Sequence, residues 1–116
     1  MAKKYVILDT ETTGIGEKDR VIQLGYVVLG GEKVEVHNEF NSSETPISFG
    51  AMEVHGITQD MIDGKPACVD TEAFKRLQEL NETDNYMIIH NAPFDLGMLE
   101  KEGFDVRMKV IDTLRV

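Results

Sequence analysis

Short apolar runs separated by polar or glycine-bearing segments predict a succession of strands in the first third of the chain. Residues 5–8 are continuously apolar and rich in β-forming side chains, which predicts a strand buried on both faces. Residues 21–29 predict a second strand. The hairpin signal Gly30-Gly31 leads to a third strand over 34–40, where apolar and polar residues alternate and His37 is expected to face solvent. We therefore expect the domain to open with sequential antiparallel strands.

The middle of the chain predicts loops and one amphipathic helix. Residues 41–69 contain two prolines and several glycines, so we expect a loop with short helical turns. Asp70 is a candidate N-cap for a helix over 71–80, whose buried side would carry Phe74 and Leu77. The acidic segment that follows is typical of a solvated loop.

The last third alternates strand and helix. Residues 86–90 form another short apolar run, and Pro93 is placed where the first turn of a helix tolerates proline. That helix is expected to end at Gly103 and to be followed by a strand over 109–111. Asp112-Thr113 resembles the cap of a further helix, but the sequence ends at residue 116. The order of elements predicts one α/β domain over residues 1–116, cut before its C-terminal part.

Composition narrows the functional classes. Twelve Lys and Arg against 21 Asp and Glu give a net charge of −9, which argues against a general basic surface for nucleic acid. The single cysteine, Cys68, cannot form an internal disulfide, and three separated histidines do not suggest a Cys/His zinc site. No apolar run is long enough for a signal-peptide core or a membrane span, so a cytoplasmic location is expected.

Three carboxylates are candidates for chemistry. Asp9 and Glu11 are two positions apart on a strand and therefore project from the same face, where a divalent cation such as Mg²⁺ would relieve their repulsion. The alternative is a pair of solvated turn acids. Asp95 falls in the first turn of the helix after Pro93, where it could be only a dipole partner. If that helix packs across the end of the first strand, all three acids could bind metal for phosphodiester hydrolysis.

Four segments carry a resemblance to a known family. Residues 9–14, DTETTG, resemble the first motif of the DnaQ-like, or DEDD, 3′–5′ exonucleases, and residues 90–95, HNAPFD, resemble the second. Residues 54–58 resemble the loop between these motifs, and residues 111–114 resemble the strand that follows. All four occur in family order. The chain is therefore identified as similar to this family, above all to the branch of proofreading epsilon subunits of bacterial DNA polymerase III.

The resemblance implies a ribonuclease-H-like mixed sheet flanked by helices. It implies hydrolysis of single-stranded DNA from the 3′ end with release of nucleoside monophosphates, two Mg²⁺ or Mn²⁺ ions, and possible association with a replicative DNA polymerase subunit. It further implies that Asp9, Glu11 and Asp95 are catalytic metal ligands. The implied substrate-binding residues are Thr12, Thr13, His55 and Asn91.

The sequence also departs from the family. The third motif of the epsilon-like branch supplies a histidine base and a fourth metal-binding aspartate spaced H-x-x-x-x-D. No histidine occurs after His90, and the aspartates after Asp95 are only Asp105 and Asp112. The isolated chain is therefore expected to have weak or no nuclease activity. Two alternatives remain open: an RNA-directed exonuclease of the same family, and a non-catalytic binding module of the same fold.

Overall fold

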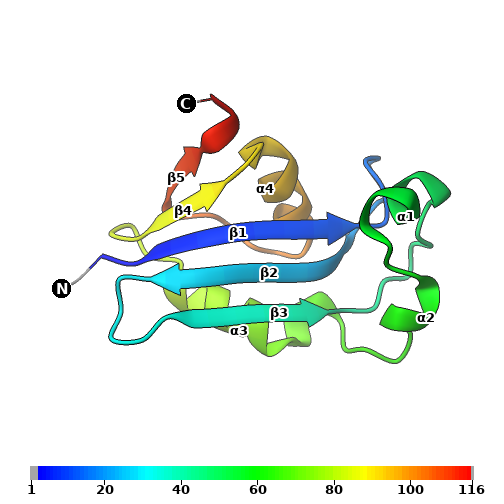
Figure 1. Ribbon diagram of the computed structural model, residues 1–116, viewed down its shortest axis with the longest axis horizontal. Coiled ribbons are helices and arrows are strands. Elements are labelled where there is room, and N and C mark those ends of the chain that lie inside the picture. Colours follow the sequence, from blue (N-terminus) through cyan, green and yellow to red (C-terminus); the bar gives the residue numbers. More distant parts are fainter. Residues whose placement is uncertain (1–2, 116) are drawn as a thin grey trace.

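A five-stranded mixed sheet forms the centre of the computed structural model, which describes residues 3–115 (Figure 1). The strand order is β3-β2-β1-β4-β5. Strands β1, β2 and β3 pair antiparallel with one another, whereas β4 pairs in parallel with β1 and β5 in parallel with β4. The strands are β1 (Tyr5–Thr12), β2 (Val21–Leu29), β3 (Glu35–Phe40), β4 (Tyr86–Ile89) and β5 (Lys109–Asp112). The predicted antiparallel opening and the α/β class are confirmed.

Helices cover one face of this sheet and one of its ends. The α-helices are α1 (Phe49–His55), α2 (Gln59–Ile62), α3 (Glu72–Leu80) and α4 (Ala92–Lys101), and two 3₁₀ turns are η1 (Cys68–Asp70) and η2 (Thr113–Arg115). Side chains of α3 and α4 form one buried core with the inward residues of β1, β2 and β4. The short helices α1 and α2 lie beyond the C-terminal end of β1 and enclose a smaller isoleucine cluster (Figure 1). No helix within residues 3–115 is long and apolar enough to cross a membrane.

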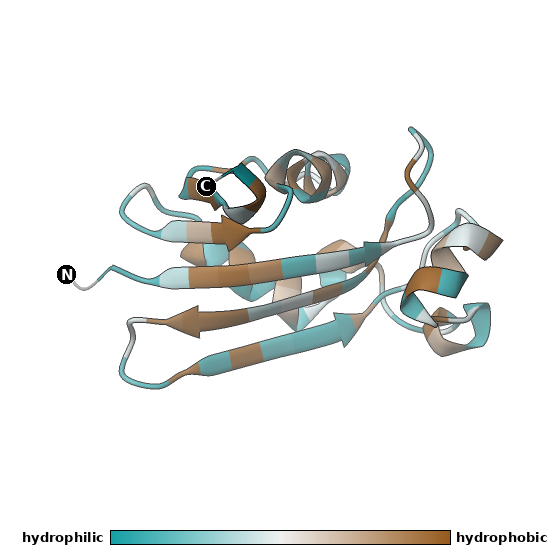
Figure 2. Cartoon of the chain, turned by 45° about the horizontal axis from the view of Figure 1, so that its top comes forward, coloured by the Kyte–Doolittle hydropathy of each residue, from teal (hydrophilic) through white to brown (hydrophobic). Residues whose placement is uncertain are grey.

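Only one face of β1 is buried, so the prediction of a strand buried on both faces is wrong. Val6 and Leu8 are buried against the helices, whereas Ile7 between them is 44% exposed. The neighbouring strands bury their residues with the same alternation. In Figure 2 the apolar middle of β1 gives way to polar residues toward its C-terminal end. Buried and exposed residues thus alternate along β1 although the run is continuously apolar. Both faces of this segment carry apolar side chains, but the helix layer covers only one of them.

On β3 the polar and apolar sides are exchanged relative to expectation. Val36 is 71% exposed on the open face of the sheet. Glu35 lies on the other side and forms a two-pronged ion pair with Arg76 of α3, with N–O distances of 2.9 and 2.8 Å. His37, expected to face solvent, lies with its ring centroid 4.7 Å from that of Tyr26. The polar edge of α3 explains the difference, because it offers charged partners to this edge strand.

The helix over residues 72–80 begins one residue later than predicted. Its N-cap is Thr71, whose hydroxyl accepts a hydrogen bond of 3.1 Å from the Phe74 amide, whereas Asp70 belongs to the preceding 3₁₀ turn. Threonine fulfils the same capping role as aspartate because its side-chain oxygen reaches the same amide groups. Phe74 and Leu77 are buried, as expected.

Candidate active site

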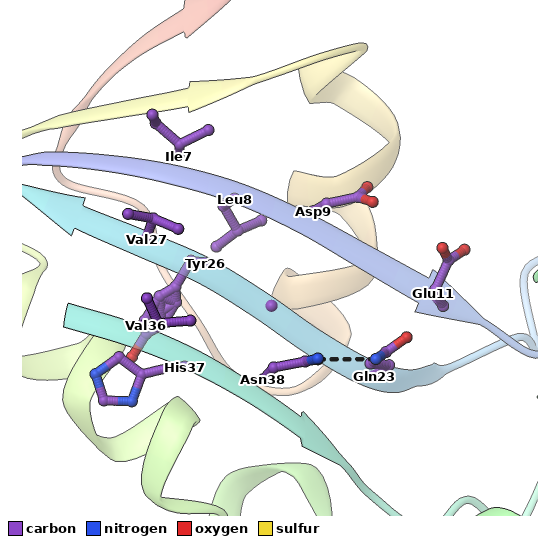
Figure 3. Close-up of a pocket in the computed structure, with 11 residues that line it drawn as sticks. Ile7, Leu8, Asp9, Glu11, Gln23, Tyr26, Val27, Val36, His37 and Asn38 are labelled. Atoms are coloured by element: carbon purple, nitrogen blue, oxygen red, sulfur yellow. Dashed lines mark hydrogen bonds between the residues drawn. The ribbon is translucent and has the colours of Figure 1, made fainter. Parts of the chain in front are cut away.

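Asp9 and Glu11 project from the open face of the sheet, as predicted from their spacing. On that face β1 pairs Asp9 with Gly25 and Glu11 with Gln23 of β2. Because Gly25 has no side chain, a shallow cavity of about 330 Å³ remains beside the two carboxylates (Figure 3). Asn38 of β3 lines its far side and accepts a 2.8 Å hydrogen bond from the Gln23 amide. The two acids therefore border a hollow with polar amides on its opposite wall.

Asp95 reaches β1 from the opposite side. Pro93 lies in the first turn of α4, as predicted. Asp95 lies in the same turn and is only 4% exposed. One Asp95 carboxylate oxygen accepts a hydrogen bond of 3.2 Å from the Thr10 amide and another from the Thr10 hydroxyl. Thr10 stands between Asp9 and Glu11, and its side chain points toward the helices because strand side chains alternate. The structure thus attaches the second motif directly to the first.

The three carboxylates influence one another electrostatically. Burial raises the pKa of Asp95 to about 6, the negative charge of Asp9 acts in the same direction, and the Thr10 hydrogen bonds oppose both. Burial also raises the pKa of Glu11, with a further contribution from Asp9, while His55 lowers it. The charge of Asp9 thus acts on both Glu11 and Asp95, and negative charge is concentrated toward the C-terminal end of β1.

The donor chemistry of this region suits a hard divalent cation. Carboxylate oxygens are the preferred protein ligands of Mg²⁺, and a cation would offset the repulsion between the acids. Within residues 3–115, however, no three His, Cys, Asp or Glu side chains are gathered closely enough to form a metal site. The reason is geometric: Asp9 and Glu11 stand on the open face of β1, while Asp95 is held at its edge by Thr10.

His55 joins helix α1 to the end of β1. Its Nδ1 accepts a 3.0 Å hydrogen bond from the Ile57 amide, which requires the proton to be on Nε2 in the neutral ring. The Nε2 atom then donates to the Thr12 carbonyl oxygen at 3.0 Å. His55 is half-buried. Both ring nitrogens are therefore engaged in holding the loop against β1, and the ring itself lies beside the carboxylates.

A second, largely apolar cavity adjoins the acids at this end of the sheet. It has a volume of about 410 Å³, and Glu11 and His55 lie on its wall together with Phe94 of α4. Ile15 and Val54, which also line it, are 90% and 85% exposed. The cavity therefore offers apolar contact surface within reach of the carboxylate cluster.

The last two threonines of the first motif shape the loop that follows β1. The Thr12 hydroxyl donates to the Gly14 carbonyl oxygen at 2.7 Å, and the Thr13 hydroxyl donates to Asp19 at 2.7 Å. Both side chains are buried. A Cβ atom on residue 14 would lie 2.6 Å from Asp19 Oδ2, so a larger residue than Gly14 would displace the Asp19 side chain. Of these residues, Thr12 and Gly14 line the apolar cavity.

Asn91, the remaining predicted substrate residue, is exposed and has a left-handed backbone with φ of 66°.

Two residues that matter at this end of the sheet were not singled out from sequence as parts of the site. Thr10 holds Asp95, and its place between two acids in the first motif could have indicated this role. Asp112, expected only to cap a later helix, accepts hydrogen bonds from the Asn91 and Ala92 amides at 2.9 and 3.1 Å.

The fold and the site define an α/β domain that brings the acids of two motifs to the C-terminal end of its central strand. A family model described as exonuclease, RNase_T, matches residues 6–116. The chain therefore belongs to the RNase_T exonuclease family, in agreement with its DnaQ-like motifs.

Two relatives and one solved structure show the range of similarity. The chain is 39% identical to DNA polymerase III PolC-type from Bacillus cereus over 97% of its length and 8% of the relative's. It is 34% identical to DNA polymerase III subunit epsilon from Buchnera aphidicola over 98% of its length and 54% of the relative's. A zinc-bound exonuclease I–single-stranded DNA complex from E. coli has a TM-score of 0.77 at 17% identity, covering 98% of this chain and 28% of that one. These matches confirm the predicted fold, and the chain spans about half or less of each protein.

Proposed function

We propose that this chain is the catalytic part of a metal-dependent 3′–5′ exonuclease that acts on single-stranded DNA and releases nucleoside monophosphates. The observation that carries the proposal is the attachment of Asp95 to Thr10, which brings the acids of the two motifs to one end of β1. The relatives named as DNA polymerase III components support a DNA substrate and an association with a replicative polymerase. The exonuclease I complex supports a single-stranded substrate.

In this proposal Asp9, Glu11 and Asp95 hold one or two divalent ions, Mg²⁺ or Mn²⁺. Such ions, when bound, activate a water and stabilise the departing oxygen of a phosphodiester. Asp95 is fixed by Thr10, so its carboxylate enters the reaction already oriented. Because Asp95 is buried on the helix side, the open face, with Asp9 and Glu11, is the side from which a phosphate approaches.

The apolar cavity beside Glu11 provides the proposed place for the terminal nucleotide. Phe94 and the exposed Ile15 and Val54 offer surface for a base or sugar, and Thr12 and His55 border the same space. Thr13 contributes by closing the loop behind them. Asn91 stands exposed at the start of α4, where its amide group can meet the substrate strand.

The decisive experiment measures degradation of a 5′-labelled single-stranded DNA by the complete protein that contains this chain. We expect stepwise shortening from the 3′ end with Mg²⁺ or Mn²⁺ and none with chelator. Asp9→Ala is expected to abolish the activity because it removes a metal ligand while leaving the exposed strand position sterically free. Asp84→Ala is the matched control, since Asp84 is an exposed acid in the loop before β4. Undiminished activity of Asp9→Ala would contradict the assignment.

The same assay separates the remaining alternatives. DNA and RNA oligonucleotides of matched length and sequence distinguish a proofreading nuclease from an exoribonuclease of the same family. For residues 1–116 alone we expect weak or no turnover, because no His-x-x-x-x-Asp pair follows Asp95. Robust turnover by this chain would contradict that expectation. Metal binding without turnover by the complete protein would favour a binding module over an enzyme.

A further inference from the structure

The segment between β4 and α4 is held by two adjacent side chains at the end of β5. Asp112 Oδ1 accepts from the Asn91 amide at 2.9 Å, and Oδ2 accepts from the Ala92 amide at 3.1 Å. The neighbouring Thr113 hydroxyl lies 3.0 Å from His90 Nδ1. Three consecutive residues of the second motif are thus bound by two consecutive residues that lie 20 to 23 positions away in sequence.

These contacts replace a cap that the helix lacks. Asn91 is the N-cap residue of α4, but its side chain makes no capping hydrogen bond and its backbone is left-handed. The first amides of a helix have no partner within the helix and need an external acceptor. The Asp112 carboxylate supplies that acceptor, and its negative charge also suits the positive end of the helix dipole. Its side chain is only 12% exposed.

The geometry points to Asp112 as a positioning residue for Asp95. We propose that the Asp112 carboxylate fixes the start of α4 in the orientation in which Asp95 meets Thr10 at the edge of β1. Asp95 is four residues from Asn91, one helical turn beyond the amides that Asp112 binds. Any rotation of α4 about this point moves the Asp95 carboxylate relative to Asp9 and Glu11. The importance of this contact for catalysis rests on the function proposed above.

The Thr10 amide is a direct reporter of the Asp95 position, because its hydrogen-bond acceptor is the Asp95 carboxylate. Amide hydrogen exchange is measured by NMR on the 116-residue chain in metal-free buffer. In Asp112→Ala we expect the Thr10 amide to exchange roughly fivefold faster, the effect of losing a helix cap. The amides of Thr13 and Asn41, which bond to carbonyls of the β1–β2 turn and β2, serve as internal references.

Two variants control this experiment. Asp112→Asn keeps one acceptor oxygen and loses the other, so we expect its Thr10 exchange rate to lie between those of the unmodified chain and Asp112→Ala. We also expect Asp112→Asn to fold if Asp112→Ala does not, so that the measurement can still be made. Asp105→Ala removes an exposed acid from the loop before β5 and is expected to leave Thr10 exchange unchanged. Mn²⁺ affinity, measured by paramagnetic broadening, should fall roughly tenfold in Asp112→Ala, as for residues that support a metal ligand.

The outcomes separate the positioning role from the proposed function. Unchanged Thr10 exchange in Asp112→Ala overturns the inference, and so does equal acceleration at Thr10, Thr13 and Asn41, which indicates general destabilisation. Unchanged Mn²⁺ affinity despite faster Thr10 exchange overturns the connection to the metal ligands. If the unmodified chain binds no Mn²⁺, the three acids do not form the proposed metal site by themselves, while Thr10 exchange still decides whether Asp112 positions Asp95.

Discussion

Asn81 is a single side chain that ties helix α3 to the segment leading into β5. Its Nδ2 donates to the Asp105 carbonyl oxygen at 2.7 Å, and its Oδ1 accepts from the amides of Arg107 and Met108 at 2.7 and 3.3 Å. The residue is 7% exposed. Because backbone groups that are buried need partners, one asparagine here satisfies three groups that no regular element pairs.

We predict that Asn81→Ala lowers the free energy of unfolding by about 2–3 kcal/mol, since it removes three hydrogen bonds and leaves their backbone partners unsatisfied. Urea denaturation followed by circular dichroism measures the change. Asn38→Ala is the control, because Asn38 is exposed and has one hydrogen bond, from Gln23. Its effect should stay within about 0.5 kcal/mol. Equal destabilisation by the two substitutions would show that burial of the Asn81 network is unimportant.

At the scale of elements, the edge strand β3 is joined to helix α3 by charge. Arg76 binds Glu35 through two parallel hydrogen bonds, and this lowers the pKa of Glu35 to about 2, with a smaller contribution from His37. A carboxylate with a lowered pKa in the folded state adds stability above its unfolded-state pKa, and the contribution is lost as pH falls toward the folded-state value.

We predict that Glu35→Gln destabilises the protein by roughly 1–2 kcal/mol at neutral pH, a value reduced for partial exposure of the pair. The difference from the unmodified chain should shrink as pH falls from about 4.5 toward 2. Denaturation at a series of pH values measures it. Glu72→Gln, on the exposed side of α3, is the matched control and should show little difference at any pH. A difference for Glu35→Gln that is constant with pH would contradict the ion-pair explanation.

The extent to which sequence predicts these elements follows from what each element contacts. The bounds of β2 and the first turn of α4 depend on local signals, the apolar run and Pro93, and both were predicted correctly. The face that β1 and β3 bury depends on where α3 and α4 lie, which no local pattern specifies. The spacing of Asp9 and Glu11 predicted their shared face, whereas the Thr10–Asp95 contact joins residues 85 positions apart and is visible only in the folded chain.

Across the whole molecule, the charge of −9 and the acidic end of β1 favour a dependence of stability on divalent cations. We predict that Mg²⁺ raises the melting temperature more than NaCl of equal ionic strength. At a metal concentration one hundredfold above Kd, binding of the ion raises the free energy of unfolding by about 2.7 kcal/mol. Differential scanning calorimetry measures the shift.

The variant Asp9→Ala should lose the Mg²⁺ effect and, without metal, unfold at a higher temperature than the unmodified chain because repulsion with Glu11 and Asp95 is relieved. Asp84→Ala should keep the full effect. Equal melting temperatures in Mg²⁺ and NaCl for the unmodified chain would show that the acids do not bind the ion.

The placement of β1 between an antiparallel and a parallel neighbour has a consequence for the order of folding. Strands β1, β2 and β3 are consecutive and can pair as soon as they leave the ribosome, whereas the residues that pair β4 with β1 are 81 positions apart. We therefore expect the hairpin layer to form early, with Thr10 already in place. Asp95 arrives with the parallel pairings of β4 and β5, so we expect the three acids to come together later than the hairpin layer, once helix α4 has docked beside Thr10 in the nascent chain.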